Sequence, residues 1–228
     1  MKRRFFTARC QLMLLVAITL IVSRSAPGQQ TKFAQAQQEN ARALRQYHWN
    51  SRTEVRKGGE TKSTKLYLMR YAVDGTLQQT LINEESQKIP TRGLRGLIAR
   101  KKKEDFVELL DNLGTLAKSY GNLSADRMQR FMASATTTTE TTSQSRLIRI
   151  EGRDVLLPGD SMTVWVDAAT RRQRRIEVRT TFDGKPLSIA SQFQDLPNGL
   201  TFMARSVIDY PDKELTVITD NFDYRRER

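Results

Sequence analysis

The sequence predicts an α+β fold in which antiparallel strands follow one another in chain order and a helical stretch interrupts them. Three observations support this prediction. Short segments with apolar residues at every second position are separated by turn dipeptides such as Asp74-Gly75 and Asp183-Gly184. No helical pattern separates the later strands, which is typical of an antiparallel meander. Over residues 91–135 the apolar spacing changes from two to three and four, which indicates helices.

The first 28 residues resemble a secretory signal peptide. A cationic start precedes the uncharged apolar stretch 12–22, which is shorter than the roughly 20 residues that a membrane-spanning helix needs. The small residues Ala26-Pro27-Gly28 follow, so we expect cleavage after Gly28 and a mature chain that starts at Gln29. An uncleaved signal anchor is the alternative. In both cases we expect the folded part to lie in the periplasm or cell envelope.

Cysteine usage and charge restrict the function classes. The only cysteine, Cys10, lies in the leader and not at the cleavage site, so we expect no disulfide, thiol nucleophile or lipid-modified cysteine in the mature chain. Cleavage removes five cations and lowers the formal net charge from +13 to +8: Lys2, Arg3, Arg4, Arg9 and Arg24. A basic exported protein is expected to meet anionic headgroups, acidic polymers or an acidic partner rather than nucleic acid. A basic surface that only aids solubility is the alternative.

The mature chain, residues 29–228, has a length that suits a single domain with its own core. We expect a short amphipathic helix over 38–47. In the helical middle, Gly121 is a suitable stop and Ser124 a suitable N-cap of a second helix. The threonine-rich segment 136–145 is either a loop or an edge strand. Strands are expected over 49–56, 65–73, 77–82, 146–150, 162–166, 176–182, 187–193, 201–210 and 214–224.

The segment VWVDAATRRQRRIEV, residues 164–178, reads as a hairpin with a basic tip. Asp167 and Thr170 can bond back to turn amides. Four arginines lie at the hairpin end and on the solvent side of the return strand: Arg171, Arg172, Arg174 and Arg175. They either discourage edge-to-edge association or contact an anionic ligand or membrane surface. If they are exposed, replacing all four by serine leaves the melting temperature nearly unchanged.

Several strands carry apolar side chains on both faces, for example where Trp165 alternates with its two valine neighbours. A sheet with one wet face alternates more cleanly. We interpret the pattern as a sheet curled around a helix with an apolar hollow between them, while ordinary core packing is the alternative. Six residues are the candidate lining of this hollow: Trp49, Tyr67, Met69, Tyr71, Val164 and Val166.

Residues suited to catalysis are sparse. His48 is the sole histidine, and without a cysteine little remains for a zinc site or a nucleophilic triad. Gly159-Asp160-Ser161 is similar to the short serine block of some esterases, but no histidine follows it. We therefore predict a protein that is not an enzyme and that uses no metal or cofactor, and a hydrolase with a concealed site is the alternative.

Several segments resemble the LolA-like superfamily of envelope proteins, which includes the periplasmic lipoprotein carrier. They are YHWNSRTEV, LYLMRYAVDG, and VWVDAATRRQRRIEV followed by DGKPLSIASQFQDLPNG. The resemblance implies an open β half-barrel whose concave face is covered by helices and holds a lipid or an acylated partner. The RPxxxRW-like block that the carrier usually has after its second strand is missing, so the resemblance extends to the fold more readily than to the cargo.

Two function hypotheses follow. The first is a non-enzymatic envelope protein that binds a lipid or lipidated ligand in the apolar groove, with Arg171, Arg172, Arg174 and Arg175 as headgroup contacts and an anionic membrane surface as a possible partner. The second is a module that docks an envelope partner through its basic surface and an exposed sheet edge.

Overall fold

The computed structural model describes residues 27–86, 93–141 and 146–227. The predicted signal peptide lies outside these ranges except for its last two residues, and its cleavage stays a prediction. Helix α1 (Pro27–Leu44) begins eleven positions before the predicted helix and ends three positions earlier. Its alanines and glutamines have good helix propensity, which explains why the helix includes the glutamine-rich lead-in.

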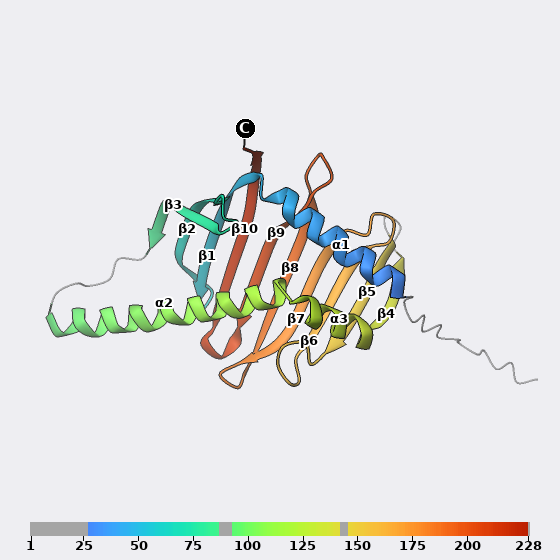
Figure 1. Cartoon of the computed structure of the whole chain (residues 1–228). Coiled ribbons are helices and arrows are strands. Elements are labelled where there is room, and N and C mark those ends of the chain that lie inside the picture. Colours follow the sequence, from blue (N-terminus) through green and yellow to red (C-terminus); the bar gives the residue numbers. More distant parts are fainter. Residues whose placement is uncertain (1–26, 87–92, 142–145, 228) are drawn as a thin grey trace, which may run out of the picture.

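Within the described residues, ten strands form one open antiparallel sheet (Figure 1). The strands are β1 (Tyr47–Lys57), β2 (Glu60–Tyr71), β3 (Leu77–Ser86), β4 (Thr136–Thr141), β5 (Arg146–Arg153), β6 (Ser161–Asp167), β7 (Gln173–Phe182), β8 (Lys185–Asp195), β9 (Thr201–Tyr210) and β10 (Leu215–Arg226). The predicted meander is confirmed. The threonine-rich segment forms the edge strand β4, and its last residues, 142–145, lie outside the described part.

The order of the sheet is β3-β2-β1-β10-β9-β8-β7-β6-β5-β4. Two meanders, one of three and one of seven strands, are therefore joined by a single long-range pairing. β1 lies antiparallel to β10, from Tyr47 opposite Arg226 to Lys57 opposite Leu215. This pairing makes β3 and β4, which are neighbours in strand number, the two opposite edges of the sheet.

The chain between β3 and β4 has to cross the width of the sheet, and the helices α2 (Gly93–Gly121) and α3 (Ala125–Ser134) make this crossing. Ten strands spaced about 4.8 Å apart span about 43 Å, and the 29 residues of α2 rise about 44 Å. The first turns of α2 extend beyond the β3 edge, and α3 completes the crossing (Figure 1). As expected, α3 is capped by Ser124, whose hydroxyl accepts from the Arg127 amide at 3.4 Å.

All three helices lie on the concave face of the curved sheet, which gives the predicted half-barrel (Figure 1). The core is the layer between this face and the buried residues of α2 and α3, which are Leu113, Tyr120 and Phe131. Gly152 in β5 lets α3 approach closely, because a Cβ at this position would lie 2.7 Å from Phe131 Cδ2. None of the described helices is both long enough and apolar enough to span a membrane.

A buried carboxylate fastens α2 to the sheet. Asp160, in the β5–β6 loop, is 2% exposed, and the Tyr120 hydroxyl at the end of α2 donates to its Oδ2 at 2.6 Å. The amides of residues 155–157 donate to the same carboxylate at 2.6 to 2.9 Å. Burial opposes ionisation, but these hydrogen bonds prevail and lower the pKa of Asp160. Asp160, the middle residue of the esterase-like triplet Gly159-Asp160-Ser161, thus holds the β5–β6 loop and the end of α2 in place.

We expect Asp160→Asn to lower the free energy of unfolding by about 1–3 kcal/mol. The side-chain nitrogen of the new asparagine cannot accept, so some of the donors around Asp160, which are the Tyr120 hydroxyl and the amides of residues 155–157, lose their acceptor. An unfolded aspartate has a pKa of about 3.9, and the folded pKa lies below its ordinary value. The difference in free energy of unfolding between the wild type and the variant is therefore complete above about pH 5. It is lost as the pH falls through the pKa of Asp160 in the folded state. Urea unfolding of both proteins between pH 7 and acidic pH measures this difference. A difference that does not change with pH would contradict the role of the ionised carboxylate.

Candidate ligand-binding face of the sheet

The pairing register places all six predicted lining residues on the face that carries the helices. Residues paired directly across strands lie on the same side of a sheet. Such pairs connect Val164 in β6 to Thr53 in β1 through Ile176, Ser191, Ser206 and Thr219. Trp49 shares the face of Thr53, and Met69 and Tyr67 pair with Trp49 and Ser51. Tyr71 follows at the next alternate position of β2.

The six residues nevertheless lie in two different environments. Three of them are buried: Trp49 is 8% exposed, and Val164 and Val166, which are 5% and 2% exposed, belong to the core under α2 and α3. Tyr67, Met69 and Tyr71 are only half-buried. The face is therefore packed from β1 across to β5 and more open at β2 and β3.

An aromatic cluster marks the boundary of the open part. Trp49 stacks on Tyr224 with ring centroids 5.1 Å apart and also contacts Tyr71 at 5.7 Å. The ring centroids of Phe202 and Tyr224 lie 4.3 Å apart. The Trp49 indole donates to Asn221 Oδ1 at 3.3 Å, and burial raises the pKa of Tyr224. These contacts make the cluster a rigid apolar wall.

Two leucines of the edge strand extend this apolar surface. Leu77 and Leu81 pair with Tyr71 and Tyr67, so they lie on the same face, and each is 48% exposed. We call Tyr67, Met69, Leu77 and Leu81 the β2–β3 strip. The two leucines were not among the predicted lining residues, although they occupy alternate positions of the predicted strand 77–82.

Small hydroxyl side chains occupy the middle of the same face. Ser51, Thr53, Thr219, Ser206 and Ser191 lie side by side on β1, β10, β9 and β8. Ser191 and Ser206 share a hydrogen bond at 3.1 Å. Between the aromatic cluster and the core, the sheet therefore presents short polar side chains that can donate to ester or hydroxyl oxygens.

The β6–β7 hairpin forms at the predicted place, and Asp167 holds its turn. Its carboxylate accepts from the amides of Ala169 and Thr170 and from the Thr170 hydroxyl at 2.8 to 3.0 Å. These hydrogen bonds, led by that of the Thr170 amide, lower the pKa of Asp167 against a smaller effect of burial.

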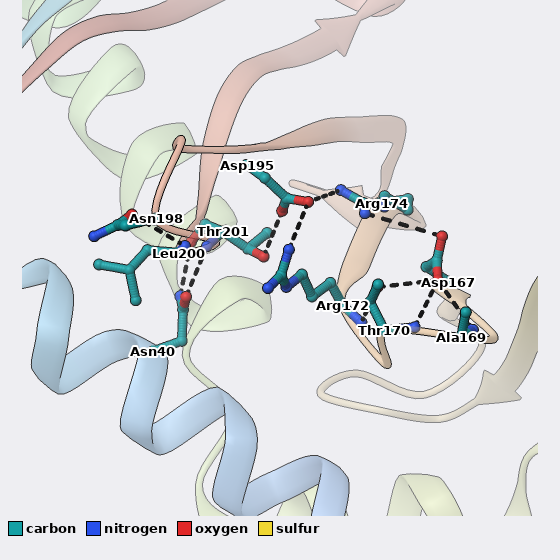
Figure 2. A network of polar contacts seen from close by, with 10 residues as sticks. All are labelled: Asn40, Asp167, Ala169, Thr170, Arg172, Arg174, Asp195, Asn198, Leu200 and Thr201. Carbon is teal, nitrogen blue, oxygen red and sulfur yellow. Dashed lines mark hydrogen bonds and ion pairs between the residues drawn. The ribbon is translucent and has the colours of Figure 1, made fainter.

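Three of the four hairpin arginines form ion pairs with acids, and two of these three, Arg172 and Arg174, share Asp195. Asp195 at the end of β8 lies 3.1 Å from Arg172 Nη1 and 2.9 Å from Arg174 Nη1 (Figure 2). The Thr201 hydroxyl also donates to Asp195 at 2.8 Å. Although burial opposes it, this set of contacts lowers the pKa of Asp195. The long arginine side chains thus connect the β6–β7 and β8–β9 hairpins.

The other two arginines lie apart from this network. Arg175 is paired with Trp165 across β6 and β7, on the face opposite to the helices. Its guanidinium lies 5.3 Å from the Trp165 ring centroid and forms an ion pair with Glu177. Arg171 is exposed at the turn with a positive φ of 59°. The four predicted headgroup contacts do not gather at one place.

The same network holds α1. The Asn40 side chain donates to the Thr201 carbonyl and accepts from the Thr201 amide, both at 2.7 Å (Figure 2). Gln37 donates to the side chain of Gln173 at 3.3 Å. Because these polar contacts connect α1 to the ends of β7 and β9, the position of α1 depends on the hairpin that contains the arginines.

The described residues contain a single histidine, His48, and no cysteine. In this part of the chain, no group of three or more histidine, cysteine, aspartate or glutamate side chains is arranged to hold a metal ion. Buried Asp160 and the partly buried Asp167 and Asp195 serve as acceptors for turn amides, hydroxyls and guanidinium groups.

Comparison with known proteins finds solved structures that are similar to this chain at low sequence identity. No family model matches the chain, and no curated protein matches it. A DUF1329 family protein from Desulfovibrio piger has 9% identity over 85% of this chain and 92% of its own, with a TM-score of 0.38. A LolA superfamily protein from Nitrosomonas europaea has 14% identity over 86% and 94%, with a TM-score of 0.36. A domain from Vibrio parahaemolyticus named for outer membrane lipoprotein sorting has 11% identity over 87% and 93%, with a TM-score of 0.38. All three TM-scores lie below 0.5 and all three identities below 15%, so no property of these proteins is transferred to this chain.

The pairing with Asp195 predicts a measurable role for two of the arginines. Replacing Arg172 and Arg174 by glutamine is expected to lower the free energy of unfolding by about 1 kcal/mol, since the pairs are partly exposed and screened by solvent. The control replaces Arg130 and Arg179, exposed arginines on α3 and β7, and removes the same charge with almost no loss. Equal stability of the two double variants in urea unfolding would contradict a structural role for the Asp195 pairs.

Proposed function

We propose that this protein is a non-enzymatic protein of the periplasm or cell envelope that binds a lipid or a lipidated protein through an acyl chain. The chain lies along the β2–β3 strip and against the aromatic cluster. The observation that carries this proposal is the partly exposed apolar surface on the helix-bearing face of an open sheet. The family resemblance of the sequence and its predicted signal peptide are consistent with it.

The chemistry of the strip suits an acyl chain. Leu77 and Leu81 each have about half of their surface in water, and covering apolar surface is favourable by about 25 cal/mol per Å². Each methylene of a bound chain contributes about 0.8 kcal/mol. The thioether of Met69 adapts to a flexible chain, while the rings of Trp49 and Tyr71 provide the rigid wall.

The proposal assigns different parts to the predicted lining residues. Trp49, Tyr67, Met69 and Tyr71 contact the ligand. Val164 and Val166 are buried with α2 and α3, and in this proposal they form the base that keeps the sheet curved.

A second candidate function is an interaction module that uses the sheet edge. Among the described strands, β3 pairs only with β2, and all ten of its residues are exposed. Such an edge can accept an added strand from a partner. Amide hydrogen exchange that slows along β3 when an envelope partner is added, with no bound lipid in an organic extract, would favour this function over the first.

We expect Leu81→Asp to weaken binding of dansyl-undecanoic acid by about tenfold or more, because a carboxylate replaces an apolar contact worth roughly 1.5 kcal/mol or more. Leu81 is exposed, so the variant is expected to fold. Fluorescence titration of the purified chain measures the affinity.

The matched control for this titration is Trp165→Asp, which introduces the same charge on the opposite face of the sheet. Its affinity for the probe is expected to equal that of the wild type. An unchanged affinity of the folded Leu81→Asp variant would show that the strip does not bind the acyl chain.

A further inference from the structure

An arginine-lined recess lies where three segments of the chain meet. The end of α1, the β2–β3 turn and the end of β10 surround an open space of about 620 Å³. Arg42 lies in the last turn of α1, and Arg45 and Gln46 follow the helix. The backbone carbonyl of Gln46 accepts from the Glu227 amide at 2.8 Å. This contact and the antiparallel pairing of β1 with β10 bring the two ends together (Figure 1).

Three guanidinium groups line the recess. Arg226 is oriented by Gln46, whose side-chain oxygen accepts from Nε at 3.1 Å and from Nη2 at 2.7 Å. Arg45 lies over the β2–β3 turn, with Nη1 3.2 Å from the position of a Cβ on Gly75. Neither Arg42 nor Arg45 forms an ion pair with a carboxylate within the described parts of the chain.

Two carboxylates also line the recess, and they do not neutralise it. Asp74 is engaged in its own turn, where it accepts from the Thr76 amide at 2.9 Å and from the Thr76 hydroxyl at 2.6 Å. Glu227 is exposed. Three cations face two anions, so an excess positive charge remains. Cations near a helix C-terminus are favourable without any ligand, and the arginines alone therefore do not define a binding site.

Tyr71 provides the connection to a ligand. It lines the recess, contacts Trp49 of the aromatic cluster and pairs with Leu77 of the β2–β3 strip. The uncovered apolar surface thus leads directly to the uncompensated arginines. An amphiphile with an anionic head and a hydrocarbon tail has both complementary parts in the same order.

We infer that the recess binds the phosphate or carboxylate head of an amphiphile whose acyl chain lies on the β2–β3 strip. This inference rests on the proposed function and adds the class of head group and its contacts. Guanidinium groups bind phosphate and carboxylate in a bidentate manner. Arg42 and Arg45 hold the head, Arg226 completes the site, and the hairpin arginines Arg172 and Arg174 remain committed to Asp195.

The test compares three probes below their micelle concentrations on the chain that starts at Gln29, by isothermal titration calorimetry. Decyl phosphate has both parts, monodecanoylglycerol has a neutral head, and inorganic phosphate has no tail. The wild type is expected to bind decyl phosphate about tenfold or more tightly than either of the others, which corresponds to one charge-assisted contact or more.

Replacing Arg42 and Arg45 by glutamine is expected to abolish the preference for decyl phosphate over monodecanoylglycerol while the affinity for monodecanoylglycerol stays the same. The charge-matched control, with Arg130 and Arg179 replaced by glutamine, is expected to keep the preference. Melting temperatures of both double variants establish that they are folded.

The outcomes separate this inference from the proposed function. Equal binding of the neutral and the phosphate probe by the wild type would overturn the recess and leave acyl binding intact. Equal loss of the preference in both double variants would attribute it to the net charge and also overturn the recess. Inorganic phosphate that binds as tightly as decyl phosphate would reduce the site to a small-anion site. If neither acyl probe binds, the proposed function fails, and the inference fails with it.

Discussion

The pairing of β1 with β10 is the constraint on which the rest of the structure depends. It joins the three-stranded and the seven-stranded meander into one sheet and makes β3 and β4 its edges. The chain must then cross the sheet between these edges, and α2 is long enough to make most of this crossing before α3 completes it. The crossing helices cover one face of the sheet. The core forms between them and this face, and the candidate ligand face is the part of the same face that they leave more open. The recess also depends on this pairing, because it brings Arg226 next to the residues that follow α1.

The distribution of side-chain sizes along the covered face explains why one part is packed and another open. Phe131, Leu113 and Tyr120 fill the space over β5–β10, and Asp160 fastens the end of α2 there. Short hydroxyl side chains follow in the middle, and the aromatic cluster limits the face at the top of β1 and β10. Beyond this cluster, no such large side chains cover Met69 and Leu81. Met69 is therefore only half-buried, and Leu81 is 48% exposed. The apolar strip is therefore a surface that the fold presents to a ligand, while the valines of β6 stabilise the fold.

Local patterns predicted the elements well, and the long-range contacts could not be predicted from them. The strand over 201–210 was predicted at its observed bounds, because Asn198-Gly199 and Pro211 flank an alternating pattern. Period-two spacing also predicted that Tyr67 and Met69 share a face. It could not predict which part of that face the helices cover, so it did not separate buried Val164 from half-buried Met69. The pairing of Arg172 and Arg174 with Asp195 joins separate hairpins, and neither segment contains a signal for its partner.

The central claim is that an acyl chain lies on the β2–β3 strip of the helix-bearing face. The most direct measurement is paramagnetic broadening of methyl NMR signals by a doxyl-labelled stearic acid. The account predicts that the methyl signals of Met69, Leu77 and Leu81 broaden, while those of Val207, which the register places on the opposite face, stay sharp. Broadening of Val207 with sharp signals for the strip, or no broadening of either set, would contradict the account.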